Sequence, residues 1–429
     1  MPQSSLIRQG ALSTVGVAVQ GLARFGYSIL IARFVGADSL ALVNTLISLS
    51  IILSLLWPTA AGNAAGTFLA RALRNRRSPR YVLRLLWISN AIAAVVIGTI
   101  AAITASTLAG AQPTETVAVI ALTFAWSAYI LTRGIRMGLG EVGSAAVWDA
   151  ISAAASLGLL ALVILAGQTA LLLWPLTLGY ALFALSAVPS MRRKRPDLTP
   201  DTATSPGDVW HLIAWNSVGL VASNGLIQFS MVFAFASSSP EEAGMFAAAI
   251  ALATPASMLA QAVSQVLIPR YAHWLEDDPA HARGHHLRIM AAMTAVLLVA
   301  FGAVAALAPW LVPFLYGPGY EDAVPLLRLL LLGVFLFSIG LIASSFLITS
   351  WRTLAATISS AIGLVLGVAA MVGTSASLGG AVAAAVGVIV GTAASALLAS
   401  IWSFRTPPDA PARLKPWTPA AGEEAEDLR

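Results

Sequence analysis

A single arginine, Arg24, lies in the middle of the first long apolar run of the chain, residues 11–34. A guanidinium at mid-membrane depth costs about 2.5–3.5 kcal/mol on insertion scales, so it needs polar neighbours or water. Gln20, Arg24 and Tyr27 are three or four residues apart, which places them on one face of a helix. This spacing predicts a cation on a polar face, able to bind an anionic group. The alternative is a structural arginine that donates hydrogen bonds to carbonyls of a neighbouring helix.

Amide side chains form similar stripes in the seventh and eighth apolar runs. Each run carries two of them at a spacing of four residues, Asn224 with Gln228 and Gln261 with Gln265. Such amides can hydrogen-bond a hydroxyl-rich ligand, or they can join packed helices for about 0.6 kcal/mol each. Arg270 follows at the end of the eighth run, where it can contact a charged headgroup or only fix the orientation of the helix.

The composition is that of a polytopic membrane protein. Of the 429 residues 58% are hydrophobic and only 10% are charged, with a mean hydropathy of +0.83, values that exclude a soluble protein of this length. The chain has no cysteine, which excludes disulfides and metal centres bound through thiolates. Four of the five histidines lie in one polar segment, as solvated histidines do, so we predict no metal and no cofactor. Nucleic acid is not expected as a partner.

Twelve apolar runs are separated by polar segments, and each run is long enough to cross a bilayer as a helix. The predicted fold is therefore all-α, with about twelve transmembrane helices. If the N-terminus is inside, 21 of the 24 Arg and Lys residues fall on the cytoplasmic side, which predicts that both termini are cytoplasmic. The runs are 11–34, 40–63, 84–107, 113–135, 146–167, 169–189, 210–236, 243–267, 288–314, 323–349, 354–373 and 379–403.

The chain divides near its midpoint into two similar halves. The segment 190–209 is rich in proline and arginine and follows the sixth run, which is typical of an extended linker. It separates an N-lobe, residues 1–189, from a C-lobe, residues 210–404, and the tail 405–429 is predicted to be disordered. The first, seventh, eighth and, more weakly, second runs carry the polar stripes. We therefore predict that these four surround a polar interior, while the others face lipid or pack.

Three segments resemble the polysaccharide-exporter branch of the multidrug/oligosaccharidyl-lipid/polysaccharide exporter superfamily, and the likeness covers nearly the whole chain. They are ILIARFVGADSLALVNTL (29–46), VLIPRYA (266–272) and FLYGPGYEDAVPLLRLL (314–330). The resemblance implies two pseudo-symmetric six-helix lobes around a central cavity lined by the first, second, seventh and eighth helices. It further implies a flippase that moves a polyprenyl-pyrophosphate oligosaccharide from the cytoplasmic to the outer leaflet by alternating access.

Such a cargo requires a cation for its phosphates and amides or hydroxyls for its sugars, while its tail is expected to stay in lipid. The predicted binding residues are Arg24, Gln20, Tyr27, Asn224, Gln228, Gln261, Gln265 and Arg270. Only two of the 24 basic residues are lysine and alanine is abundant, which indicates a GC-rich bacterial genome. The resemblance then implies the bacterial inner membrane as the location. We expect a monomer whose partners are this cargo, membrane lipids and the glycosyltransferases or polymerase of the same pathway.

Two other functions compete with this one. A drug or cation exporter of the same superfamily would need acids inside a lobe, and Asp149 is the only candidate; we expect it to pair with Arg133 or Arg136. An integral-membrane polysaccharide polymerase would need a sizeable extracytoplasmic loop with catalytic groups, and no such loop is predicted. Without a carboxylate at mid-membrane or a nucleotide-binding motif, the membrane potential is the energy source that we hypothesise.

Overall fold

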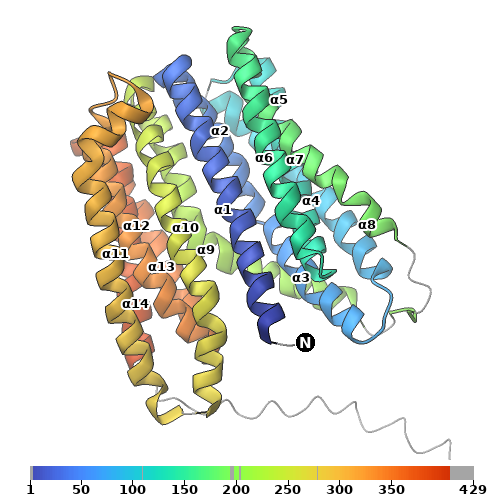
Figure 1. The fold of residues 1–429 in the computed structure, drawn as a ribbon. Helices are drawn as coiled ribbons and strands as arrows, with labels where there is room; N and C mark the ends of the chain where they lie inside the picture. Colours follow the sequence, from blue (N-terminus) through green and yellow to red (C-terminus); the bar gives the residue numbers. More distant parts are fainter. Residues whose placement is uncertain (1–2, 109, 194–197, 202–203, 278, 406–429) are drawn as a thin grey trace, which may run out of the picture.

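The computed structural model describes residues 3–108, 110–193, 198–201, 204–277 and 279–405, and these residues are almost entirely helical (Figure 1). The described part contains no strand, and a single β-bridge joins Arg77 to Thr199. A short 3-10 turn, η1 (Thr169–Leu171), precedes α7. The helices are α1 (Gln3–Phe34), α2 (Ala37–Leu55), α3 (Pro58–Arg74), α4 (Arg80–Leu108), α5 (Pro113–Gly138), α6 (Val142–Leu165), α7 (Trp174–Ser186), α8 (Val188–Arg192), α9 (Pro206–Ser237), α10 (Pro240–Asp277), α11 (Pro279–Tyr316), α12 (Ala323–Thr349), α13 (Thr353–Leu378) and α14 (Gly380–Arg405).

Eleven segments of the described chain are long and apolar enough to cross a membrane. They correspond to all of the predicted runs except 243–267, and that run is the 38-residue helix α10, some of whose side chains lie outside the described part. Side chains on α11 such as Leu298 and Val299 are 59% and 72% exposed, as expected for a helix that faces lipid. The prediction of an all-α polytopic membrane fold is confirmed.

The predicted second run, 40–63, is wrong at its C-terminal end. α2 ends at Leu55, and Pro58 starts a separate helix, α3, after the non-helical residue Trp57. A proline has no N–H to donate and disfavours helical geometry in the preceding residue, so the chain breaks there and restarts with Pro58 at the first helical position. α3 packs closely on α5, because a Cβ atom on Gly134 would lie 2.0 Å from the carbonyl oxygen of Gly62.

The predicted linker, 190–209, is shorter than expected. α8 extends to Arg192, and α9 begins at Pro206, where the Ser205 hydroxyl accepts a hydrogen bond from the N–H of Asp208. Thr199 exchanges backbone hydrogen bonds with the turn between α3 and α4, so the described part of the linker is attached to that turn.

Figure 1 shows two groups of helices, α9–α14 on one side of the molecule and α1–α8 on the other, with α1 and α2 at the boundary between the groups. α1 and α2 pack on α10, and α2 also packs on α9. The four helices predicted to surround the interior are therefore the ones that meet at the centre.

Candidate functional site

A cavity lies between α1, α2, α9 and α10, with about 560 Å³ of empty space including its open mouth. Its wall combines aliphatic side chains with a band of polar ones. The polar residues are Arg24, Ser28, Asn44, Ser48, Gln228 and Thr254. Arg24 is the single charged residue of this wall within the described chain, so the cavity carries positive charge.

Arg24 lies over an aromatic ring and is paired with no acid of the described residues. Its guanidinium carbon lies 5.6 Å from the ring centroid of Trp126 on α5, a cation–π contact worth about 0.5–2 kcal/mol. The Trp126 indole N–H donates to the Ser54 hydroxyl at 2.9 Å, which fixes the ring in place. Among the residues that the structure describes, the guanidinium has no hydrogen-bond or ion-pair partner. Its N–H groups are therefore available to a ligand in the cavity.

A hydrogen bond between Ser28 and Asn44 joins two of the helices that form the wall beside Arg24. The Ser28 hydroxyl is 3.2 Å from both the Arg24 carbonyl oxygen and Asn44 Oδ1, to which it can donate. Asn44 Nδ2 donates to the Leu40 carbonyl at 3.2 Å. The first contact connects α1 to α2, and the two contacts of Asn44 orient its amide at the cavity surface.

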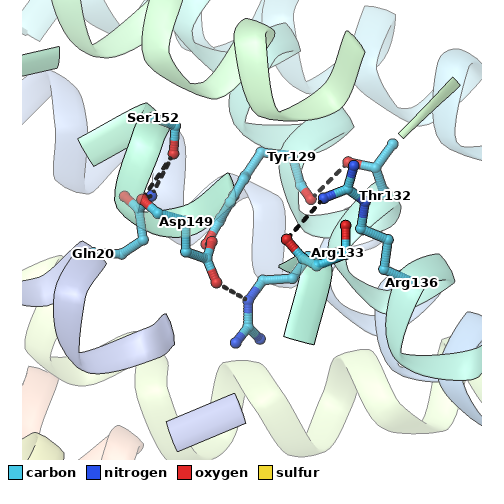
Figure 2. A network of polar contacts seen from close by, with 8 residues as sticks. Gln20, Tyr129, Thr132, Arg133, Arg136, Asp149 and Ser152 are labelled. Carbon is cyan, nitrogen blue, oxygen red and sulfur yellow. Dashed lines mark hydrogen bonds and ion pairs between the residues drawn. The ribbon is translucent and has the colours of Figure 1, made fainter. Parts of the chain in front are cut away.

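Gln20 and Tyr27, predicted to bind ligand, lie outside this cavity. Gln20 is 6% exposed, and its amide nitrogen donates to Ser152 Oγ at 2.7 Å and to the Asp149 carbonyl at 2.8 Å (Figure 2). Tyr27 is 2% exposed, and its hydroxyl donates to the Leu172 carbonyl. A helix turns by about 100° per residue, so Arg24 lies about 40° and Ser28 about 80° around α1 from Gln20. Gln20 therefore points towards α6, away from the cavity.

The remaining predicted residues divide between the cavity and its surroundings. Gln228 lines the cavity opposite Arg24. Asn224 lies one turn away, outside the cavity wall, and donates to the Ser223 hydroxyl at 2.8 Å. Gln261 is partly exposed and Arg270 is exposed, both beyond the cavity wall. The side chain of Gln265 lies outside the described part of the structure.

The predicted partner of Asp149 is Arg133 rather than Arg136. Arg133 Nε is 3.1 Å from Asp149 Oδ2, and the Tyr129 hydroxyl donates to Oδ1 at 2.8 Å (Figure 2). Arg136 instead donates to the Ser186 carbonyl at 2.7 Å. Asp149 is fully buried in this network between α5 and α6, so this carboxylate does not reach the Arg24 cavity.

Two residues of the site were missed by sequence reasoning. Asn44 is four residues before Ser48, an amide and hydroxyl pair on one face of an otherwise apolar helix, and that spacing could have indicated it. Trp126 lies in the middle of α5, where a tryptophan is unusual because the residue prefers membrane interfaces. No pattern in the sequence pairs it with Arg24. Within the described residues, no three His, Asp or Glu side chains gather as metal ligands would.

The two groups of helices are in contact at the end of the molecule where α1 ends and α2 begins. Tyr320 donates its hydroxyl to the Ala32 carbonyl at 3.3 Å, and Arg33 donates to the Phe314 carbonyl at 3.5 Å. Gly244 of α10 lies against the backbone of Ala37 at the start of α2. The cavity is therefore closed off at this end by contacts between helices of opposite groups.

A family model described as polysaccharide biosynthesis protein matches residues 72–325. Among proteins with curated descriptions, no sequence is significantly similar to the chain. Solved transporters of the MOP superfamily share the fold. A multidrug resistance MATE family transporter matches with a TM-score of 0.72 in its inward-facing conformation, at 16% identity over 91% of this chain and 97% of that chain.

The outward-facing conformation of a MATE family transporter matches less well. Its TM-score is 0.59, at 15% identity over 94% of this chain and 95% of that chain. A MOP superfamily transporter from Pyrococcus furiosus has a TM-score of 0.61, at 17% identity over 94% and 95%. The TM-score is thus higher for the inward-facing structure than for the outward-facing one.

Proposed function

This chain belongs to the polysaccharide biosynthesis protein family, and on that basis we propose that it flips a polyprenyl-pyrophosphate oligosaccharide from the cytoplasmic to the outer leaflet by alternating access. The chain is a multi-pass membrane protein with the fold of MOP-superfamily transporters. Beyond this fold, we propose the identity of the cargo, the direction in which it moves and the residues that bind it.

The observation that carries the proposal is the state of Arg24. A guanidinium with no hydrogen-bond or ion-pair partner in the described structure faces a cavity at the interface of the two groups of helices. A guanidinium offers paired N–H donors that match two oxygens of one phosphate, and such charge-assisted bonds are about twice as strong as neutral ones. An anionic headgroup is the ligand that would compensate this charge.

The polar residues around Arg24 suit the sugar part of the cargo. Asn44, Gln228 and Thr254 come from three different helices and face the same cavity. Amide and hydroxyl groups can donate and accept hydrogen bonds, as sugar hydroxyls require. A cationic drug would instead require a carboxylate, and Asp149 is already paired with Arg133 away from this cavity.

Alternating access requires that one end of the interface open while the other closes. The contacts of Ala32, Arg33 and Ala37 with the opposite group would form the closed outer gate, if the N-terminus is cytoplasmic as the charge count predicts. We propose that breaking these contacts exposes the Arg24 cavity to the outer leaflet. An inside-negative membrane potential would favour outward movement of the anionic cargo.

The experiment is transport of a fluorescent polyprenyl-pyrophosphate oligosaccharide in proteoliposomes. Arg24→Ala is expected to abolish transport at unchanged protein level, and Arg24→Lys to retain part of it because the charge remains but the paired donors are lost. Arg328→Ala is the matched control, since Arg328 also lies in a transmembrane helix but donates to the Ala305 carbonyl away from the cavity. Equal transport by wild type and Arg24→Ala would refute the proposal.

A further inference from the structure

A second and larger cavity lies inside the C-terminal group of helices, between α9, α12, α13 and α14, with about 1310 Å³ of empty space including its open mouth. No charged residue lines it within the described chain. Its walls are formed by aliphatic and aromatic side chains such as Leu220, Leu226 and Phe337, together with small residues and hydroxyls. The part of a ligand that this cavity holds is therefore expected to be uncharged.

The hydroxyls of the cavity are partly used within their own helices. Ser223 donates to the Gly219 carbonyl at 2.8 Å, and Thr392 donates to the Val388 carbonyl at 2.7 Å. A hydroxyl that donates to the preceding turn has no O–H left to donate to a ligand and can only accept. The surface offered is thus largely apolar, which favours a hydrocarbon chain over a sugar.

α9 is the wall between the two cavities. Leu226 lines the larger cavity, Gln228 lines the Arg24 cavity, and Ile227 between them lines both. One molecule with an anionic head and an apolar chain could therefore place its head beside Arg24 and its chain on the other side of α9.

The larger cavity also lies towards the ends of the helices at which the cargo would enter. It is lined by residues near the start of α13, such as Thr353, and near the end of α12, such as Ile348. The distribution of arginines predicts that this end of the helices is cytoplasmic. A chain from the cytoplasmic leaflet would meet this cavity first.

From this juxtaposition we propose that the cavity between α9, α12, α13 and α14 binds the polyprenyl chain of the cargo whose pyrophosphate is bound by Arg24. The inference rests on the proposed function and replaces the expectation that the tail remains in bulk lipid. Ile227 then separates the polar from the apolar part of one bound molecule.

The variant that tests this site is Gly219→Leu. A Cβ atom on Gly219 would have Thr357 Oγ1 as its nearest neighbour, at 4.0 Å, so a leucine can enter the cavity without a backbone clash. Gly302→Leu is the matched control, because Gly302 on α11 has nothing within 4 Å of its Cβ position and is exposed. Thr357→Leu fills the cavity from the opposite wall if Gly219→Leu does not fold.

The measurement is photo-crosslinking of the purified full chain with two probes. One is a polyprenyl pyrophosphate with a diazirine in its isoprenoid chain, and the other is a phosphatidylglycerol with a diazirine in an acyl chain. The first probe is expected to label cavity residues of α9 and α13. Gly219→Leu should lower this labelling about tenfold, which is the loss of affinity expected when about two methylene groups of the isoprenoid chain no longer fit in the cavity. Gly302→Leu should leave the labelling unchanged.

The possible outcomes separate the two proposals. If labelling by the pyrophosphate probe depends on Arg24 but falls only on lipid-facing surfaces, the tail site is wrong and the proposed function stands. If the phosphatidylglycerol probe labels the cavity equally well, the cavity is a general lipid site and the inference is overturned. If neither Arg24→Ala nor Gly219→Leu changes the labelling, both proposals are overturned.

Discussion

Gly244 at the start of α10 lies directly against the backbone of Ala37 at the start of α2: a Cβ atom on Gly244 would be 2.6 Å from the Ala37 carbonyl oxygen. Any other residue would therefore force the two groups of helices apart at this end. We predict that Gly244→Val opens the proposed outer gate. Because the chain has no cysteine, spin labels can be placed at the exposed residues Thr114 and Asp322 on opposite groups, and the distance between them measured by double electron–electron resonance.

The distance distribution should shift to longer values in Gly244→Val and stay unchanged in Gly302→Val, which meets no neighbour. Identical distributions in Gly244→Val and wild type would show that this contact does not hold the gate closed.

Gln20 and Gln228 should behave in opposite ways, although both are glutamines in apolar helices. Gln20→Ala removes two buried hydrogen bonds to Asp149 and Ser152, so we expect it to lower the stability by about 1–3 kcal/mol without changing transport per folded molecule. Gln228→Ala should leave the melting temperature unchanged and weaken cargo binding, because its side chain lines the Arg24 cavity. Melting curves in detergent and binding assays on the same preparations test both. A loss of binding with Gln20→Ala at unchanged stability would contradict this assignment.

The ion pair between Arg133 and Asp149 is expected to stabilise the helices α5 and α6. Arg133→Ala leaves a fully buried carboxylate without its cation, which should lower the free energy of unfolding by about 3–5 kcal/mol. Adding Asp149→Asn removes that unpaired charge and should restore part of the loss. The melting temperatures of the single and double variants provide the measurement, and a double variant no more stable than Arg133→Ala would argue against this view.

Transport should depend on the membrane potential. An inside-negative potential favours outward movement of an anion by about 2.3 kcal/mol per charge per 100 mV, so a potassium gradient with valinomycin is expected to accelerate transport in proteoliposomes. The control is the same gradient without valinomycin. Transport that is indifferent to the imposed potential would exclude direct coupling.

The membrane-spanning helices could be predicted from the sequence because each apolar run must be long enough to cross the membrane and positive charges gather on its cytoplasmic side. The four helices that meet at the centre could be predicted because their apolar runs carry polar side chains. Arg24 and Gln228, which line the cavity, could be singled out from the sequence because a polar residue is unusual in an apolar run. Gln20 and Tyr27 share a face with Arg24, but they lie about 40° and 60° around α1 from it, on the side away from the cavity. The sequence does not reveal that α6 and the residue after η1 cover that side of the helix. The partner of Arg24, Trp126, is a long-range contact that no local spacing encodes.

The direct test of the account is the affinity of the purified protein for a polyprenyl pyrophosphate, measured by titration calorimetry for wild type, Arg24→Ala, Arg24→Lys and Arg328→Ala. A charge-assisted hydrogen bond is worth about 1.5–3 kcal/mol, so Arg24→Ala should bind about 10-fold to 150-fold more weakly, Arg24→Lys should be intermediate, and Arg328→Ala should match wild type. Equal affinities for wild type and Arg24→Ala would contradict the claim that Arg24 binds the anionic headgroup of the cargo.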